Sequence, residues 1–201
     1  MERDLLRAAL ASAFLALTGC DQRGFGAPTD VAFLSDGTPL VSDGYDNTRV
    51  VALGADGKLQ REWGEPGGDE GQLDLPHGIA VDADDRVYVA NRNNARIEVF
   101  SAAGAFLDAW SGPDLGRPFG VEVFGDVVYV IDGGDQIAEQ PAGRVVLLTR
   151  DGDLIGHFSG PGTGPGRLSE PHDIAVDSKG RVYVAELGTK RVQRFTLAHP
   201  P

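Results

Sequence analysis

The hexapeptide Pro171-His172-Asp173-Ile174-Ala175-Val176 decides the fold, because three similar segments precede it in the chain. These segments are Pro28-Thr29-Asp30-Val31-Ala32-Phe33, Pro76-His77-Gly78-Ile79-Ala80-Val81 and Pro118-Phe119-Gly120-Val121-Glu122-Val123. Their leading prolines are 48, 42 and 53 residues apart. A recurrence at this spacing is the sequence signature of a repeat architecture.

Each opening segment is followed by the same series of short β-branched runs. A second run comes after a turn, and a third begins at a recurring basic residue (Arg49, Arg96, Arg144 or Arg191), which we interpret as structural, bonding between blades. A turn such as Asp151-Gly152 then leads to a fourth run that ends in Trp63, Trp110 or Phe158. Such runs and turns are typical of antiparallel hairpins. Four strands in about 45 residues predict a propeller blade. We therefore expect an all-β propeller with four recognisable blades, at about residues 28–64, 74–110, 117–158 and 168–197.

The composition agrees with a folded, turn-rich β protein. Of 201 residues, 28 are Gly and 12 are Pro, and the 41% of hydrophobic residues include nine Phe and two Trp, enough for a core. A net charge of −12 makes nucleic acid an unsuitable partner. Because Cys20 is the single cysteine, the chain forms no internal disulfide framework and no thiolate cluster. Any metal ligands must then be His, Asp or Glu.

The sequence of the first 27 residues is typical of a targeting segment. An apolar run at residues 8–17, behind Arg3 and Arg7, is too short to span a bilayer as a helix. It ends in Leu17-Thr18-Gly19-Cys20, which resembles a lipobox. We expect a signal peptide at 1–19, lipidation of Cys20, a tether at 20–27 and a membrane-anchored bacterial lipoprotein at the periplasm or cell surface. The alternative is an amphipathic helix or a misassigned start, which the acidic Glu2 and Asp4 favour.

Two histidines occupy equivalent repeat positions. His77 and His172 follow the opening proline of alternate blades, so both should point to the central axis from opposite or near-opposite blades. Such a pair suits Zn²⁺, although a catalytic zinc site normally has three protein ligands, and His157 and His199 lie on other parts of the repeat. The alternative interpretation is that the Pro-His pairs are ordinary residues of the repeat with no ligand-binding role. Asp173, matched by Asp30, suits Ca²⁺ or a local turn cap.

Two loop residues complete the candidate site. Tyr45 and Arg92 each lie between the second and third strands of a blade, on loops that rim one mouth of a propeller. A phenol near a metal ion and an arginine is a candidate catalytic base. Each residue taken singly is also compatible with an ordinary surface position.

The opening segments, the Arg-Val strands and the linker at residues 160–166 resemble NHL repeats, over about residues 28–197. Together with the run Val41-Ser42-Asp43-Gly44-Tyr45, they resemble the peptidyl-α-hydroxyglycine α-amidating lyases, which cleave a carbinolamide to a peptide amide and glyoxylate. The resemblance implies a catalytic Tyr45, an active-site Arg92, zinc on His77 and His172, and calcium on Asp173. The family usually has six blades. Its first two, which supply another zinc histidine and another active-site arginine, have no counterpart here, and Asp46 replaces a family cysteine.

Two functions follow as expectations. The first is an exported, metal-dependent lyase acting on a peptide-like small substrate. The second is a non-catalytic, surface-anchored propeller that binds a peptide, protein or glycan.

The fourth repeat lacks an outer strand, so the four blades either form a small strained ring or belong to a larger one. Because exposed strand edges tend to find partners, we also expect a homo-oligomer that covers them.

Overall fold

The computed structural model describes residues 24–134 and 143–197. The predictions for Cys20, the signal peptide and His199 lie outside these residues. The described part consists of strands and turns and contains no helix. Within it, no helix is long and apolar enough to cross a membrane.

The strands form four antiparallel sheets in chain order. The first holds β1 (Asp30–Phe33), β2 (Pro39–Asp43), β3 (Arg49–Leu53) and β4 (Leu59–Trp63), and the second holds β5 (Pro76–Val81), β6 (Val87–Asn91), β7 (Arg96–Phe100) and β8 (Phe106–Ser111). The third holds β9 (Pro118–Phe124), β10 (Val127–Asp132), β11 (Arg144–Thr149) and β12 (Leu154–Ser159). The fourth holds β13 (Pro171–Val176), β14 (Val182–Glu186) and β15 (Arg191–Phe195).

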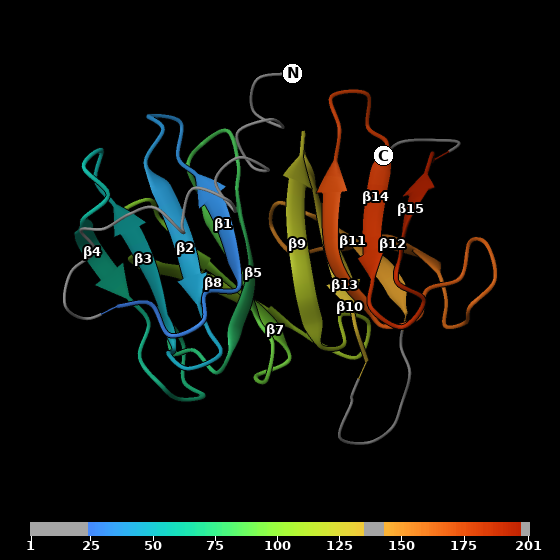
Figure 1. Ribbon diagram of the computed structural model, residues 1–201, viewed down its shortest axis with the longest axis horizontal. Helices are drawn as coiled ribbons and strands as arrows, with labels where there is room; N and C mark the ends of the chain where they lie inside the picture. Colours follow the sequence, from blue (N-terminus) through green and yellow to red (C-terminus); the bar gives the residue numbers. More distant parts are fainter. Residues whose placement is uncertain (1–23, 135–142, 198–201) are drawn as a thin grey trace.

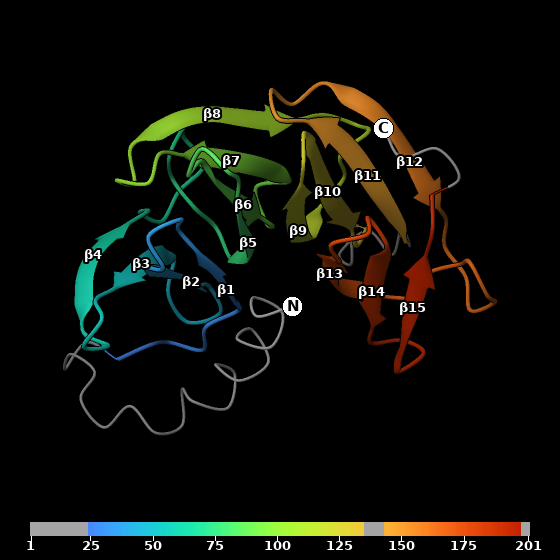
Figure 2. The same cartoon turned by 90° about the horizontal axis from the view of Figure 1, so that it is seen from above.

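The sheets are the blades of a propeller arranged as an open arc (Figures 1 and 2). Inner strands of successive blades lie side by side, β1 with β5, β5 with β9 and β9 with β13. The outer strands β4, β8 and β12 form the rim, and the first and fourth blades lie at the two ends of the arc (Figure 2). The prediction of an all-β propeller with four blades is confirmed. The small closed ring, one of the two alternatives, is not formed by the described residues.

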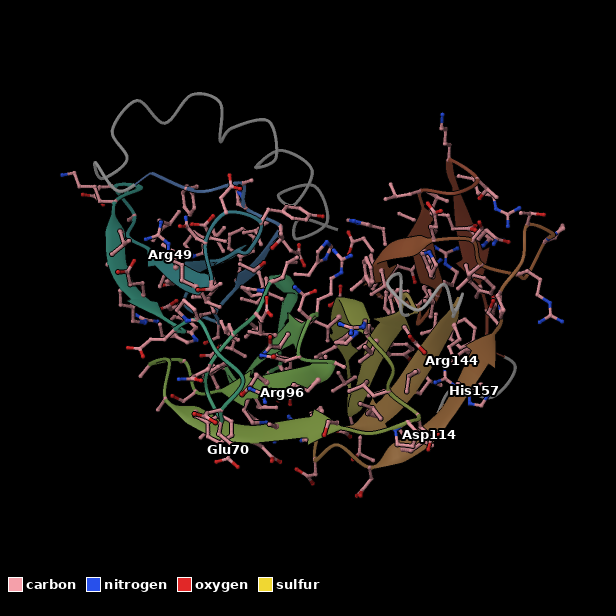
Figure 3. All side chains as sticks on the ribbon, turned by 90° about the horizontal axis from the view of Figure 1, so that it is seen from below. Arg49, Glu70, Arg96, Asp114, Arg144 and His157 are labelled. Carbon is pink, nitrogen blue, oxygen red and sulfur yellow. The ribbon has the colours of Figure 1, made fainter. Side chains whose placement is uncertain are left out.

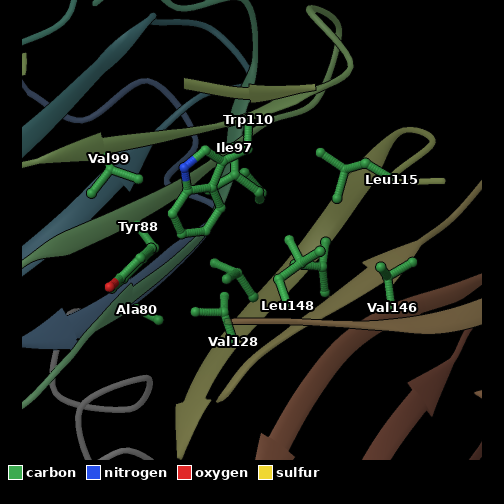
Figure 4. Packing of buried hydrophobic residues seen from close by; sticks show 12 residues of the cluster. Ala80, Tyr88, Ile97, Val99, Trp110, Leu115, Val128, Val146 and Leu148 are labelled. Carbon is green, nitrogen blue, oxygen red and sulfur yellow. The ribbon is translucent and has the colours of Figure 1, made fainter. Parts of the chain in front are cut away.

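The hydrophobic core lies between the blades. Strand residues alternate between two faces, and each face of a blade packs on its neighbour. Between the second and third blades, Tyr88, Ile97 and Trp110 meet Val128 and Leu148 (Figure 4). Equivalent clusters fill the two other junctions between blades. The apolar alternation in the sequence is therefore explained by stacking of one blade on the next.

Turn glycines of one blade pack under the aromatic residue that ends the blade before it. Gly104 and Gly152 have φ angles of +85° and +89°, which L side chains rarely adopt. A Cβ at Gly104 would lie 2.7 Å from the Trp63 indole, and one at Gly152 would lie 2.6 Å from that of Trp110. These glycines are needed both for the turn and for the spacing of the blades.

The recurring arginines attach each blade to the linker that enters it. Arg49, Arg96 and Arg144, labelled in Figure 3, and Arg191 each pair with a buried carboxylate of the same blade. Arg96 also donates from Nη1 to the carbonyl oxygen of Gly68 (2.7 Å), and Arg191 donates from Nη1 to that of Thr163 (2.9 Å). The arginines thus join a blade to its incoming linker rather than to the sheet of the next blade.

Candidate functional site

The opening residues of three successive blades converge at the inner strands. The ring centroids of His77 on β5 and His172 on β13 are 4.6 Å apart, and that of Phe119 on β9 lies 5.4 Å from His77 and 5.7 Å from His172. The imidazoles of His77 and His172 lie close together, as the repeat predicted. They do not, however, come from opposite blades. The arc is open, so the second and fourth blades are separated only by the third, and Phe119 lies beside both histidines.

Hydrogen bonds determine which nitrogen of His77 carries the proton. Nδ1 lies 2.9 Å from the carbonyl oxygen of Phe119, and Nε2 lies 3.1 Å from the hydroxyl of Tyr45. A carbonyl only accepts, so the neutral ring carries its hydrogen on Nδ1. Nε2 then accepts the hydrogen bond that the Tyr45 hydroxyl donates. The Nε2 lone pair is therefore directed at the Tyr45 hydroxyl.

Burial keeps both imidazoles neutral. His77 is 3% exposed, and burial, assisted by the nearby His172 and Arg92, lowers its pKa to about 4 although the hydrogen bond to Phe119 opposes the change. Burial also lowers the pKa of His172, and Arg92 adds to this effect while Asp173 opposes it. Both rings therefore present nitrogen lone pairs at neutral pH, the form that binds a metal ion or accepts a proton.

The run that carries Tyr45 is shaped by its contacts with the second blade. The buried Ser42 hydroxyl donates to the carbonyl oxygen of His77 at 2.7 Å. Gly44 lies so close to β5 that a Cβ there would overlap the carbonyl oxygen of Pro76. A larger residue at position 44 would push the loop outward. Ser42 and Gly44 thus place Tyr45 next to His77, a role that the sequence did not reveal.

Arg92 reaches the same group from the β6–β7 loop. Its guanidinium carbon lies 3.9 Å from the centroid of the Phe119 ring, a cation–π contact. Burial lowers the pKa of Arg92, and the positive charge of Arg117 adds to this effect. Phe119 was not among the predicted site residues. Its place in the repeat, equivalent to His77 and His172, was the feature that could have identified it.

Asp173 has a different setting from the two histidines. It is exposed on β13, and its Oδ1 accepts the backbone N–H of Ile174 at 2.8 Å. Asp30, its repeat equivalent, accepts the N–H of Val31 at Oδ1 (2.7 Å) and that of Ile79, in the next blade, at Oδ2 (3.0 Å). Calcium takes six to eight oxygen ligands, and this carboxylate supplies at most two. The geometry of Asp30 makes contact between blades the better-supported role of this position.

The donor set fits a zinc ion in part. His77 and His172 offer neutral nitrogen ligands, and the carbonyl bonded to His77 Nδ1 is the kind of partner that orients metal-binding histidines. Among residues 24–134 and 143–197, however, no group of three or more His, Cys, Asp or Glu side chains gathers to hold a metal. His157 is exposed on the outer strand β12, far from the inner strands (Figure 3). The described residues therefore supply two of the three protein ligands usual in catalytic zinc sites.

The fold and the recurring blade contacts define an NHL-repeat β-propeller, and the NHL repeat family matches residues 73–100 and 168–195. The chain is homologous to the amidating enzymes. It is 33% identical over 190 residues to rat peptidylglycine alpha-amidating monooxygenase, covering 89% of this chain and 19% of that protein. It is also 33% identical over 185 residues to peptidyl-alpha-hydroxyglycine alpha-amidating lyase 2 of Drosophila melanogaster, covering 85% and 43%.

The chain thus spans less than half the length of these two relatives. Among solved structures, virginiamycin B lyase from Staphylococcus aureus has a TM-score of 0.65 at 19% identity, covering 86% of this chain and 53% of that one. At this identity, the similarity concerns the fold alone.

Proposed function

We propose that this chain is a lyase that cleaves a peptidyl-α-hydroxyglycine-like carbinolamide to an amide and glyoxylate. The observation that carries the proposal is the Tyr45 hydroxyl bonded to His77 Nε2 at 3.1 Å, beside the second imidazole of His172. Homology to the amidating enzymes supplies the reaction class.

The chemistry assigns a role to each side chain. Tyr45, once its own proton has left to solvent, takes the proton of the substrate hydroxyl as the carbon–oxygen double bond of glyoxylate forms, and this is the proton that it later gives to the leaving nitrogen. The carbon–nitrogen bond breaks, its electron pair stays on nitrogen, and a proton returns to that nitrogen. The reaction therefore consumes no net proton. Arg92, held against Phe119, supplies positive charge to bind the substrate and to stabilise negative charge that develops on its oxygens.

His77 and His172 are the residues that would hold zinc. When bound, zinc supplies a Lewis acid that polarises the substrate hydroxyl or carbonyl. Within the chain, the carbonyl of Phe119 fixes the His77 ring, and the low pKa of His77 leaves Nε2 unprotonated at neutral pH. Because the same lone pair accepts the hydrogen bond of the Tyr45 hydroxyl, a metal ion held by Nε2 would compete with Tyr45 for it.

The test measures metal content and turnover on the purified full chain. Zinc is quantified per chain, and glyoxylate release is followed with a peptidyl-α-hydroxyglycine substrate. We expect near-stoichiometric zinc that falls in His172→Ala, and turnover that falls at least about 100-fold in Tyr45→Phe. His157→Ala, a histidine exposed on the outer strand, is the matched control and keeps both. Substoichiometric zinc that His172→Ala leaves unchanged, together with no glyoxylate, removes the lyase proposal.

The second part of the proposal concerns location. The lipobox-like sequence before Cys20 supports export and lipidation of that cysteine, which would anchor the propeller at an extracytoplasmic membrane face. Metabolic labelling with a fatty acid tests this on the full chain. Label is expected in the wild type and absent from Cys20→Ser, and equal labelling of both refutes the anchor.

A further inference from the structure

The three aromatic rings that meet at the inner strands all lie where the pairing of their sheet is interrupted. Between β5 and β6 the register shifts at His77 and Gly78, so that two residues of β5 face one residue of β6. The pairing of β9 with β10 shifts in the same way at Phe119 and Gly120, and that of β13 with β14 shifts at His172. A β-bulge of this kind disrupts the ladder locally and redirects a side chain. The direction of each ring therefore depends on contacts made at its bulge.

The first blade supplies two hydroxyl groups to the bulge at His77. The Ser42 hydroxyl, which is buried, donates to the carbonyl oxygen of His77 at 2.7 Å. The Thr29 hydroxyl lies 2.9 Å from the carbonyl oxygen of Pro76 and 2.9 Å from the Ser42 hydroxyl oxygen. The Ser42 carbonyl, 3.0 Å away, already accepts the N–H of Thr29, so we assign the Thr29 hydroxyl hydrogen to Pro76. The two peptide groups that flank His77 are then each held by a hydroxyl group of the preceding blade.

Thr29 occupies the repeat position of the site residues. It follows the opening proline of the first blade, as His77, Phe119 and His172 follow those of the later blades. The ring of His77 bonds in turn to the next blade, because Nδ1 lies 2.9 Å from the carbonyl oxygen of Phe119. In both blades the residue after the proline thus contacts a backbone carbonyl at the bulge of the following blade. In the first blade this position serves to hold His77.

The third blade limits where the bulge of β5 can move. A Cβ at Gly78 would lie 2.7 Å from the carbonyl oxygen of Phe119 and 2.8 Å from the backbone nitrogen of Val121. The bulge therefore lies directly against the backbone of β9. Since the inner strand of the first blade lies on the other side of β5, the hydroxyl groups of Thr29 and Ser42 hold the bulge from the side opposite β9.

We propose that Thr29 and Ser42 are positioning residues of the candidate site, whose two hydroxyl groups hold the His77 backbone so that Nε2 of its ring meets the Tyr45 hydroxyl. For its effect on catalysis the inference rests on the proposed lyase function, whereas the orientation of the ring does not require turnover. Both residues act through His77 and not on the substrate. Their loss therefore lowers kcat more than it changes KM.

The test observes the His77 ring by nitrogen NMR of the metal-free full chain, with the histidine side chains labelled. Thr29→Val keeps the β-branched shape but removes the hydroxyl group, and Ser42→Ala removes the other one. In the wild type we expect Nδ1 to carry the hydrogen and Nε2 to accept a hydrogen bond. Each variant should lose or weaken the signature of that bond at Nε2. Thr29→Ser, which keeps the hydroxyl group, should give the wild-type signals.

Thr149→Val is the matched control. Thr149 ends β11, and its hydroxyl oxygen accepts the N–H groups of Asp151 and Asp153 at 3.3 Å and 3.1 Å, in the turn that leads to β12. This variant also loses a threonine hydroxyl group that is hydrogen-bonded, but it should keep the His77 signals. Glyoxylate release is the second measurement, and kcat should fall at least about tenfold in Thr29→Val with little change in KM. Thr29→Ser and Thr149→Val should keep the wild-type kcat.

Circular dichroism establishes that each variant is folded, and either Thr29→Val or Ser42→Ala is sufficient for the test. Unchanged His77 signals in the folded variants overturn the proposal, whatever the turnover. So does an equal change in Thr29→Ser or in Thr149→Val, because the hydroxyl groups of Thr29 and Ser42 would then not be the cause. If the His77 signals change as expected but the wild type releases no glyoxylate, the lyase function fails and the positioning of His77 is supported.

Discussion

Removal of the His77 imidazole should change how stability depends on pH in the metal-free protein. Burial holds the folded-state pKa at about 4, below the ordinary value of 6.5. A group with a lower pKa when folded binds its proton more weakly in that state, so acid favours unfolding. The penalty is absent above about pH 6.5, grows as pH falls, and is complete below about pH 4. At about 1.4 kcal/mol per pH unit, it amounts to about 3 kcal/mol.

The assay compares the free energy of unfolding of wild type and His77→Gln by urea denaturation from pH 7.5 to pH 4, with a chelator present. The glutamine variant loses hydrogen bonds, so it should be less stable at pH 7.5 by an amount that does not vary with pH. Its disadvantage should shrink by about 3 kcal/mol on acidification, because it lacks the buried imidazole.

His157→Gln is the control, because that imidazole is exposed to water when folded. Its curve should run parallel to the wild type. If the His77→Gln curve is also parallel, the reasoning about a buried neutral imidazole is wrong.

Three further predictions concern packing and the loop of the site. Ile97→Ala should cost about 2–5 kcal/mol of unfolding free energy in urea denaturation, since Ile97 is 0% exposed, whereas Val192→Ala at the equivalent position should stay within about 0.5 kcal/mol of wild type. Gly44→Ala should displace Tyr45 from His77, because its Cβ would overlap the Pro76 carbonyl; nitrogen NMR of His77 should show loss of the hydrogen bond at Nε2, and an unchanged signal contradicts this. Phe119→Leu keeps the backbone carbonyl but removes the cation–π contact with Arg92, so it should reduce glyoxylate release more than it reduces thermal stability, and full turnover would show that the ring has no role.

The amino-acid sequence determined the blade, because the features of a blade are local. β-branched runs, Asp-Gly turns and an aromatic residue at the fourth strand recur at each repeat, and each acts over a few residues. The same repeat register identified His77 and His172 as equivalent positions. Equivalent positions in the blades of a propeller point toward the central axis in the same way, so the convergence of the two histidines could be predicted without coordinates.

Tertiary structure decided how the blades are placed, and with that the content of the site. The curvature of the arc, set by packing between blades, brings His77 and His172 together across one intervening blade and places Phe119 in contact with Arg92 and near both rings. The proton position on His77 depends on a carbonyl 42 residues away in sequence. Likewise, the second residue of the third strand is an apolar β-branched residue in every blade (Val50, Ile97, Val145 and Val192), and only the packed molecule shows that the last of them is exposed. The repeat in the sequence specifies each blade. The contacts between blades depend on residues that are distant in sequence, and a local pattern does not show them.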